Sequence, residues 1–246
     1  MKAIVTFHSI DDSGSILSYP VHLFRELLYQ LKKKQIPILD LGTLLKPNTE
    51  SGVVLTFDDG MHSVYANALP ILKEYQATAH VFVTTSAIGS DQLWPRSESD
   101  IPGFEMMSWE ELVCLRDAGI SIGAHTVDHP DMRKLTAEQV VEQCVEADSI
   151  IEQKLGSPCD FFAYPFGYHN SLVRNYIRGR YKAAVTTELS YLRVDEDHAA
   201  LPRLDSYYLQ SISRLRHVDS VIMRKYLQCR SLLRDCKGSQ CRASSE

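Results

Sequence analysis

Two neighbouring carboxylates at the end of an apolar run are the first residues in this sequence whose types could do chemistry. Residues 53–57 read Val-Val-Leu-Thr-Phe, which favours a buried strand, and Asp58, Asp59 and Gly60 follow directly. Because successive side chains of an extended chain point to opposite sides, we expect the two carboxylates to face different ways and to serve separate roles. The alternative is an Asp-Gly hairpin turn whose carboxylates are only solvated.

A second group with useful spacing is the pair His125 and His129. Residues 120–124 are strand-like and Pro130 follows the pair, so we expect a strand end and a tight loop rather than one helix face. Two imidazoles and a carboxylate make a site with three protein ligands, and these donors suit Zn²⁺ or a similar divalent transition metal better than Mg²⁺ or Ca²⁺. Alone, the His-x-x-x-His spacing is weak evidence for a metal site, since unrelated surface histidines also show this spacing.

Strand-like and helix-like segments alternate along the chain, and they would position these residues. We expect strands over residues 3–7, 36–39, 53–57, 79–83, 120–124, 161–164, 183–186 and 201–204, and helices over 20–34, 64–76, 108–118, 136–155, 170–178 and 211–236. Such alternation predicts a parallel sheet covered by helices, and this many strands in one domain favour a closed (β/α) barrel over an open doubly wound sheet. The active site of such a barrel lies at the C-terminal ends of its strands. The barrel would therefore gather His8, Asp58, Asp59 and His125 at one rim.

The composition bounds the class of protein. The chain has 246 residues, of which 44% are apolar and 23% charged, as in an ordinary globular protein with one large domain. Its formal net charge of −5 gives no reason to expect a nucleic-acid partner. We find neither a signal-peptide pattern nor a spanning apolar run, so we expect a cytoplasmic protein, and we expect its six cysteines to be reduced thiols.

The C-terminal segment differs in charge from the rest of the chain. Residues 206–246 hold eight Lys or Arg against three Asp or Glu, a balance of +5, so that residues 1–205 carry −10. We expect a barrel domain over 1–205 and a basic helical extension over 206–246 that packs on the acidic barrel. A basic amphipathic helix that makes peripheral contact with a membrane surface or a partner is the alternative.

Two of these stretches resemble the motifs of a known family. Residues 56–60 (Thr-Phe-Asp-Asp-Gly) and 125–129 (His-Thr-Val-Asp-His) are similar to the first two motifs of the polysaccharide deacetylases, the NodB-homology enzymes of carbohydrate esterase family four. The resemblance covers about residues 1–205. It implies a distorted (β/α)₇ barrel and a metal-dependent hydrolase that removes acetyl groups from an N-acetylated sugar or glycoconjugate.

The resemblance also implies roles for single residues. Carried over by position, Asp59, His125 and His129 would bind the metal, and Asp58 would be the general base. The same metal ligands and general base would serve a hydrolase of another amide, imide or ester. A sugar-binding barrel without catalysis is the alternative from a different class.

The chain departs from the commoner family pattern in its later motifs. Residues 162–167 (Phe-Ala-Tyr-Pro-Phe-Gly) lack the Arg that orients the base, and the late Asp-rich motif with its Trp is not recognisable. The family pattern also has a C-terminal Leu-x-His that carries the acid. Residues 215–217 (Leu-Arg-His) match it, but they lie in a helical basic stretch, where we expect His217 to be a solvated helix histidine.

A subset of the family resembles this chain in another arrangement. In the bacterial poly-N-acetylglucosamine deacetylases the strand that carries the histidine comes first, which implies His8 as general acid; a satisfied rim histidine is the alternative. Arg203, at the end of the last expected strand, could supply the missing guanidinium to Asp58, or could form an ordinary surface ion pair.

Aromatic residues near the rim are candidates for contact with a sugar ring. Trp94 lies in a long polar loop expected over 86–107, and Tyr164 and Tyr168 flank the end of an expected strand. Each could stack on a sugar, although aromatic residues near strand ends more often serve packing. The family resemblance also implies that a main-chain N–H near Tyr164 helps to hold the oxyanion.

Overall fold

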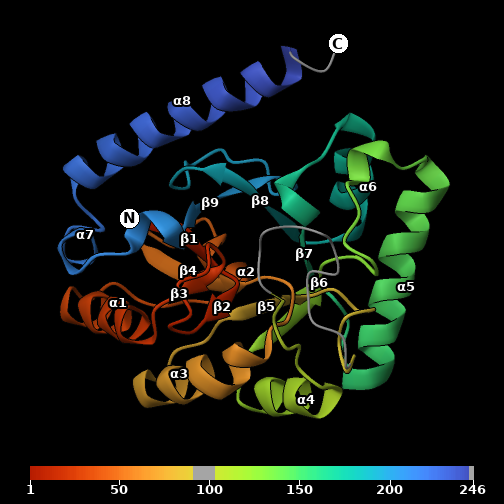
Figure 1. The fold of residues 1–246 in the computed structure, drawn as a ribbon, viewed down its shortest axis with the longest axis horizontal. Helices are drawn as coiled ribbons and strands as arrows, with labels where there is room; N and C mark the ends of the chain where they lie inside the picture. Colours follow the sequence, from red (N-terminus) through yellow and green to blue (C-terminus); the bar gives the residue numbers. More distant parts are fainter. Residues whose placement is uncertain (91–102, 244–246) are drawn as a thin grey trace.

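Seven parallel strands close into a barrel at the centre of the molecule (Figure 1). The structure, a computed structural model, describes residues 1–90 and 103–243, with side chains up to Arg234. In barrel order the strands are β1 (Lys2–Phe7), β4 (Gly52–Phe57), β5 (His80–Val83), β6 (Ser121–Ala124), β7 (Phe161–Ala163), β8 (Ala183–Leu189) and β9 (Leu201–Asp205). β9 pairs with β1 and so joins the last strand to the first. The predicted (β/α)₇ barrel is confirmed.

Helices cover the outside of the barrel, as Figure 1 shows. They are α1 (Val21–Lys33), α2 (Leu41–Leu44), α3 (Leu69–Tyr75), α4 (Trp109–Asp117), α5 (Ala137–Leu155), α6 (Ser171–Arg180), α7 (Ile212–Arg216) and α8 (Val221–Ala243). Two of the predicted helices begin with a capping box: the side chains of Ser108 and Thr136 accept N–H groups from the first turns of α4 and α5. α5 ends at Gly156, whose φ of +69° is a left-handed conformation that favours glycine.

Shorter elements connect the barrel units, and most of them were not predicted. They are a two-stranded parallel pair, β2 (Ser9–Ile10) and β3 (Ser18–Tyr19), a π-helical turn, η1 (Val64–Ala68), and three 3₁₀ turns, η2 (Met132–Lys134), η3 (Pro165–Gly167) and η4 (Ser206–Leu209). η1 and α3 together replace the single helix expected over 64–76. The turns place backbone groups near the strand ends, where the charged residues lie.

Two expected elements differ in the structure. Residues 36–39 contribute only one bridge, from Ile38 to Val53, because Pro37 has no N–H to donate and α2 begins soon after. The helix expected over 211–236 is divided into α7 and α8. The Ser220 hydroxyl accepts the Met223 N–H at 3.1 Å and so caps a new helix at the break.

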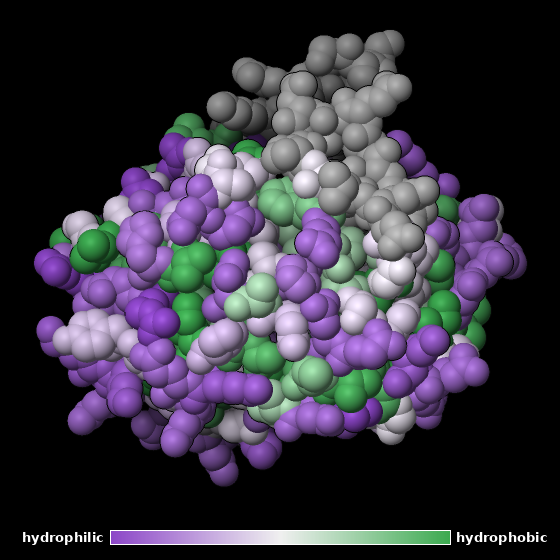
Figure 2. Space-filling model, turned by 60° about the horizontal axis from the view of Figure 1, so that its bottom comes forward, coloured by the Kyte–Doolittle hydropathy of each residue, from purple (hydrophilic) through white to green (hydrophobic). Residues whose placement is uncertain are grey.

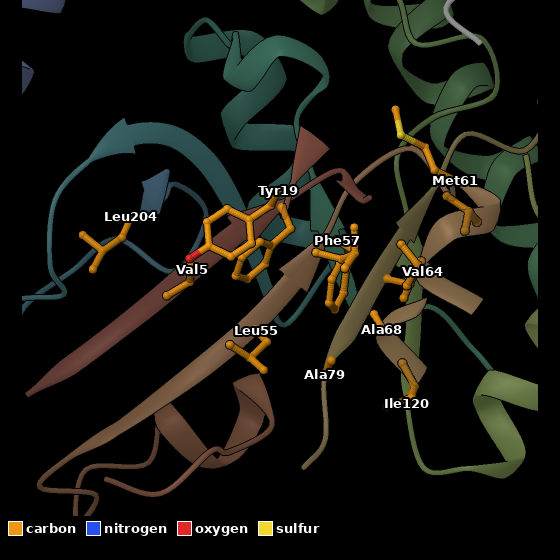
Figure 3. Packing of buried hydrophobic residues seen from close by; sticks show 14 of the residues in the cluster. Val5, Tyr19, Leu55, Phe57, Met61, Val64, Ala68, Ala79, Ile120 and Leu204 are labelled. Atoms are coloured by element: carbon orange, nitrogen blue, oxygen red, sulfur yellow. The ribbon is translucent and has the colours of Figure 1, made fainter. Parts of the chain in front are cut away.

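Strand alternation separates an inner core from an outer one. Ile4, Val54 and Phe82 belong to the cluster that fills the barrel interior. Val5 and Leu55, the next residues along the first two of these strands, point the other way and pack under the helices (Figure 3). Space for the Phe82 ring comes from Gly123 on the next strand, where a Cβ would lie 2.7 Å from that ring. Two residues beyond the apolar interior layer, the same strand faces present Thr6 and Thr56, which begin a polar layer below the rim.

The C-terminal helix packs beside the barrel through its first half. Met223 and Leu227 are buried, and the Arg224 guanidinium lies 4.5 Å from the Tyr191 ring centroid beyond β8. The division of the chain into a barrel over 1–205 and an extension over 206–246 stays a prediction. Within the described ranges, no helix has both the length and the apolar character to cross a bilayer. On the face in Figure 2, apolar residues are scattered among hydrophilic ones.

Candidate active site

The C-terminal rim of the barrel gathers the charged residues that the sequence singled out. β1 and β4 end at Phe7 and Phe57, which pair in register, so His8 and Asp58 follow at neighbouring strand ends. The Asp58 N–H donates to the Phe7 carbonyl at 2.9 Å and extends this pairing by one residue. Asp58 is buried and His8 is partly exposed. One group is thus shielded from water, and the other is open to it.

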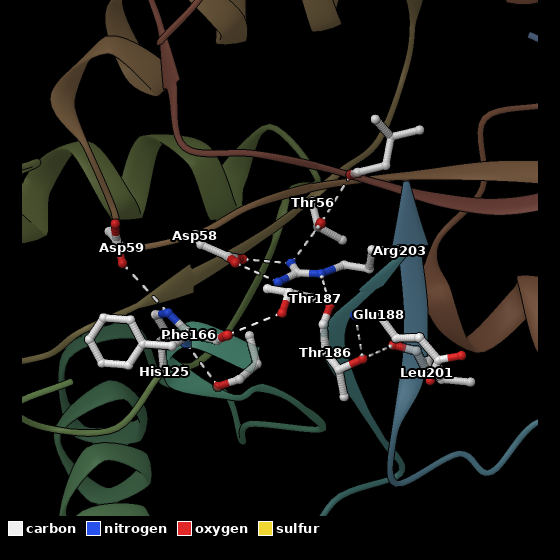
Figure 4. Close-up of polar contacts among 12 residues, drawn as sticks. Thr56, Asp58, Asp59, His125, Phe166, Thr186, Thr187, Glu188, Leu201 and Arg203 are labelled. Carbon is white, nitrogen blue, oxygen red and sulfur yellow. Dashed lines mark hydrogen bonds and ion pairs between the residues drawn. The ribbon is translucent and has the colours of Figure 1, made fainter. Parts of the chain in front are cut away.

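The backbone turns sharply immediately after Asp58. Asp59 and Gly60 have φ values of +71° and +96°, so both adopt the left-handed region. A Cβ on Gly60 would lie 2.6 Å from the Ile88 side chain, which only glycine avoids. The turn separates the two carboxylates, as the sequence predicted: Asp58 points into the barrel and Asp59 points towards the end of β6 (Figure 4).

Asp59 meets the two histidines that follow β6. Its Oδ1 lies 3.5 Å from His125 Nε2 and 3.6 Å from His129 Nε2, and one ligand atom from each residue falls within 4.8 Å of the other two. His125 and His129 come together because the loop bends back at Thr126, with φ +67°. The Thr126 hydroxyl accepts the His129 N–H at 3.0 Å and fixes this bend.

The chemistry of these three side chains fits a divalent metal ion. Asp59 Oδ1 is buried and has no hydrogen-bond partner among the described residues. His125 Nδ1 lies 2.8 Å from the Ala163 carbonyl, which can only accept, so Nδ1 carries a proton and, when the ring is neutral, Nε2 presents a lone pair to Asp59. A buried carboxylate that faces a lone pair favours a positive charge between them, which a proton or a metal ion can supply. Two imidazoles and one carboxylate are a donor set for Zn²⁺ or a similar transition metal.

The protonation of these groups points the same way. Burial alone would raise the pKa of Asp59, but the His125 imidazole and the charges of nearby histidines lower it, so Asp59 is ionised. Burial, together with the charge of His125, lowers the pKa of His129 to about 4 and keeps this ring neutral. Burial would also lower the pKa of His125, but Asp59 and Asp58 raise it instead. The cluster therefore attracts one positive charge, either a proton on His125 or a metal ion.

Asp58 is held by a guanidinium from the last strand. Arg203 donates from two nitrogens to the two Asp58 oxygens at 2.8 and 2.6 Å. It also donates to the Thr186 carbonyl at 2.8 Å and to the Thr56 hydroxyl at 3.1 Å (Figure 4). Arg203 is 1% exposed, so it does not form the surface ion pair that was the alternative expectation. Burial would raise the pKa of Asp58, but the charge and hydrogen bonds of Arg203 lower it.

The predicted contact of Tyr164 with a sugar ring is wrong. Its side chain is fully buried, and its hydroxyl donates to the Ala199 carbonyl at 2.7 Å. The alternation of β7 explains this, because Ala163 faces the barrel interior and Tyr164 consequently points out beneath the helices. Its own N–H donates to the Val185 carbonyl and is occupied in the sheet.

The other aromatic candidates have different outcomes. Tyr168 is 45% exposed beyond β7 and stays a candidate, whereas Trp94 lies outside the described residues. One ring near the site was not predicted: Phe166 is 52% exposed, and its ring centroid lies 4.5 Å from that of His129. The Pro-Phe-Gly sequence after β7 signals a turn that could have indicated this ring, since a turn at a strand end exposes its middle residue.

The family comparison agrees with this geometry. Residues 46–180, more than half of the chain, match the polysaccharide deacetylase family. The chain belongs to the polysaccharide deacetylase family.

Curated relatives of this deacetylase are distant but extensive in coverage. YxkH of Bacillus subtilis, whose name assigns it to the polysaccharide deacetylases, is 27% identical over 209 residues, which cover 82% of this chain and 70% of YxkH. The poly-beta-1,6-N-acetyl-D-glucosamine N-deacetylase of Staphylococcus aureus is 24% identical over 197 residues, which cover 76% of this chain and 59% of that enzyme. The chain thus spans less than two thirds of the staphylococcal enzyme.

Solved structures share the fold of this deacetylase. IcaB from Ammonifex degensii superimposes with a TM-score of 0.74 at 22% identity, over 87% of this chain and 96% of IcaB. The Streptococcus pyogenes deacetylase PplD, solved with acetate, gives a TM-score of 0.72 at 23% identity, over 83% of this chain and 91% of PplD.

Two departures of this deacetylase from the commoner family pattern are explained by the structure. The motif over 162–167 lacks an arginine, but Arg203 of β9, from another part of the chain, forms an ion pair with Asp58 instead. His217 is exposed at the end of α7, where its Nδ1 lies 2.8 Å from the Ser213 carbonyl. It is a solvated histidine at a helix end, as expected.

Proposed function

We propose that this polysaccharide deacetylase is a metal-dependent hydrolase that removes the acetyl group from an N-acetylated amino sugar of a glycan or glycoconjugate. One observation carries the proposal: a buried Asp-His-His cluster lies beside a second carboxylate, Asp58, that a guanidinium holds apart from it. The family match and the names of the relatives support an N-acetyl sugar as substrate.

Asp59, His125 and His129 would hold the metal, for which Zn²⁺ fits best. When bound, such an ion polarises the acetyl carbonyl and lowers the pKa of water from about 15.7 towards about 7. The protein's part is to present one anionic and two neutral donors from a rigid strand end and a tight loop. Residues of β4 and β6 fix these donors before substrate arrives.

Asp58 would act as general base and accept a proton from the attacking water. Arg203 donates to one lone pair on each Asp58 oxygen, and a second lone pair on each oxygen remains available to accept a proton. The lowered pKa of Asp58 keeps it ionised but makes it a weak base. It can therefore accept the proton only from a water molecule whose own pKa has been lowered.

His8 would act as general acid towards the leaving amine. A sugar amine cannot depart as an anion, so its nitrogen must gain a proton as the C–N bond breaks. His8 lies at the end of β1, beside Asp58 in the strand register, and is partly exposed. This position suits a group that donates one proton per turnover and then recovers one from solvent.

Acetate release from a panel of N-acetylated sugars, with and without a chelator, tests the proposal. We expect release from at least one N-acetylglucosamine oligosaccharide, its loss with chelator, and its recovery with Zn²⁺ or a similar ion. Release from simple amides or esters but not from sugars would identify a hydrolase of another substrate. Tight sugar binding without any release would identify a sugar-binding barrel.

A further inference from the structure

The loop between the two candidate histidine ligands has an unfavourable backbone. Residues 126–128 connect His125 to His129, and both Thr126 and His129 have a positive φ, of +67° and +55°. Residues other than glycine rarely adopt this left-handed region, and they do so where the surrounding structure holds them there. His125 continues the pairing of β6, since its N–H donates to the Val83 carbonyl at 3.0 Å. His129 follows the loop, so its backbone position depends on what holds the loop.

One edge of the loop is held by the chain that follows β5. The N–H groups of Thr85 and Ser86 donate to the carbonyls of Thr126 and Val127, at 3.2 and 3.0 Å. These bonds leave the N–H groups of Val127 and Asp128 to find acceptors elsewhere. Val127 is buried, and a buried N–H without an acceptor is costly. The other edge of the loop therefore needs a partner.

Gln143 of α5 supplies that partner with both ends of its side-chain amide. Its Oε1 accepts the Val127 N–H at 3.0 Å and the Asp128 N–H at 3.1 Å, and its Nε2 donates to Asp128 Oδ2 at 3.0 Å. The direction of the amide is fixed, because the N–H groups can only donate and the carboxylate oxygen accepts. All three bonds reach residues between the two histidines, and none reaches an imidazole.

We propose that Gln143 is a positioning residue of the candidate metal site, which places His129 for the ion by holding the loop over residues 126–128. The neighbouring α5 residues Cys144 and Ala147 are buried against the barrel, so Gln143 ties the loop to a packed helix. Partners that orient a metal ligand from outside the ligand set change metal affinity by about 10- to 100-fold when they are removed. This inference rests on the proposed function, because it requires that the three side chains bind a metal.

The zinc affinity of the protein, measured by competition with a chromophoric chelator, tests the inference. Gln143→Leu removes all three bonds and leaves the Val127 N–H without its acceptor, so the zinc Kd should rise by about 10- to 100-fold. Gln153→Leu, at an exposed position on the same helix, is the matched control and should leave the Kd unchanged. A Kd for Gln143→Leu that equals that of the control would overturn the inference.

An exchange of the two polar partners separates these bonds from helix packing. Gln143→Glu keeps an oxygen for the two N–H groups but sets a second carboxylate against Asp128, so the Kd should rise. Adding Asp128→Asn supplies an amide that can donate to the glutamate, and the Kd should return towards that of the unaltered protein. Asp128→Asn alone should have little effect, since the asparagine oxygen can still accept from Gln143. A double variant that binds zinc as weakly as Gln143→Glu would count against this role of Gln143.

A visible spectrum and an unfolding temperature distinguish a positioning residue from a structural one. The d–d bands of the Co²⁺-loaded protein depend on the ligands around the ion, so Gln143→Leu should alter them. The double variant Gln143→Glu with Asp128→Asn should restore them. A merely structural role would lower the Tm of the metal-free protein and leave the bands of the folded fraction unchanged, and this result would overturn the inference.

Zinc binding is measured without substrate and so separates this inference from the proposed function. A zinc Kd that depends on Gln143, in a protein that releases no acetate, would uphold the positioning role and contradict the hydrolase. Acetate release together with a zinc Kd that does not depend on Gln143 would uphold the hydrolase and contradict the positioning role. A protein that binds neither zinc nor a similar ion would contradict both.

Discussion

Adjacent carboxylates acquire opposite surroundings within one peptide bond. Asp58 lies in the barrel against Arg203, and Asp59 faces two imidazoles, because the backbone turns to positive φ between them. The Thr-Phe-Asp-Asp-Gly sequence indicated two separate roles, since side chains alternate along a strand. It could not indicate Arg203 as the partner of Asp58 with certainty, because that contact joins residues 145 positions apart.

Replacing Asp58 should separate catalysis from metal binding. In Asp58→Asn the amide cannot take the proton, so kcat should fall by about 10²–10⁴, whereas zinc content should stay near one per chain. Inductively coupled plasma analysis and acetate release measure the two quantities on one sample. Loss of zinc along with activity would reverse the roles assigned to Asp58 and Asp59.

The candidate metal ligands should show the opposite pattern and a defined pH dependence. His125→Ala and His129→Ala should each lose the metal. In the unaltered protein, zinc must displace the proton from His125, whose pKa is raised, so affinity should weaken by about tenfold per pH unit below that pKa. Because the pKa is raised, the decline should begin at a higher pH than for an ordinary histidine. A zinc Kd that is constant from pH 8 to 5.5 would contradict this.

At the scale of single elements, the N-terminal end of β5 carries a buried histidine unrelated to the rim. His80 Nε2 accepts the Leu41 N–H at 2.8 Å, and burial lowers its pKa from 6.5 to about 4. Its neighbours include the rings of Phe82 and Phe161, so a charge there has little solvation. The histidine is therefore neutral in the folded protein over the whole range in which the unfolded chain gains a proton.

His80 should make the barrel less stable in mild acid. The contribution of neutral His80 to the free energy of unfolding is fully present above pH 6.5. It is lost as the pH falls towards about 4, for a total of about 3 kcal/mol. Urea unfolding with chelator present, at pH 7 and pH 5, measures this. His80→Asn keeps an acceptor for Leu41 and should flatten the difference between the two pH values. An unchanged difference would assign the acid sensitivity to other groups.

The elements also show where sequence patterns were sufficient and where they were not. The starts of α4 and α5 were predicted correctly, because the capping boxes at Ser108 and Thr136 depend only on local residues. Tyr164 was assigned to the wrong surroundings, because the direction of the side chain that follows β7 depends on barrel register rather than on the neighbouring residues in the sequence. The break at Ser220 was missed because the residues around it still favour a helix, and one hydroxyl decides the boundary.

At the scale of the whole molecule, the site is assembled across the closure of the barrel. His8 follows the first strand and Arg203 lies in the last, and β1 and β9 are paired neighbours. The strand-then-helix alternation predicted this architecture and its rim, since the C-terminal ends of parallel strands meet at one edge. The sequence offered Arg203 as a replacement for the missing motif arginine and the structure bears this out, but a surface ion pair stayed open as the alternative because the choice depends on barrel closure.

Removing the guanidinium should therefore affect both stability and catalysis. Arg203→Met leaves the Asp58 carboxylate buried without a partner and should lower the free energy of unfolding by about 3–5 kcal/mol at pH 7. The pKa of Asp58 should rise towards the value that burial favours, so the acid limb of the pH–rate profile should move to higher pH. Asp58→Asn combined with Arg203→Met should recover part of the stability, since no unpaired charge remains. A double variant as unstable as Arg203→Met would exclude the unpaired carboxylate as the cause.

The bond between Arg203 and Asp58 also sets an order of events during synthesis. All three candidate metal ligands lie within residues 59–129, whereas Arg203, which holds the proposed base Asp58, is made some 70 residues later. A nascent chain therefore contains the ligand set well before it can orient Asp58. Docking of the last strand both closes the barrel and places the guanidinium on Asp58, so a barrel that has not closed would lack the proposed base in its working position.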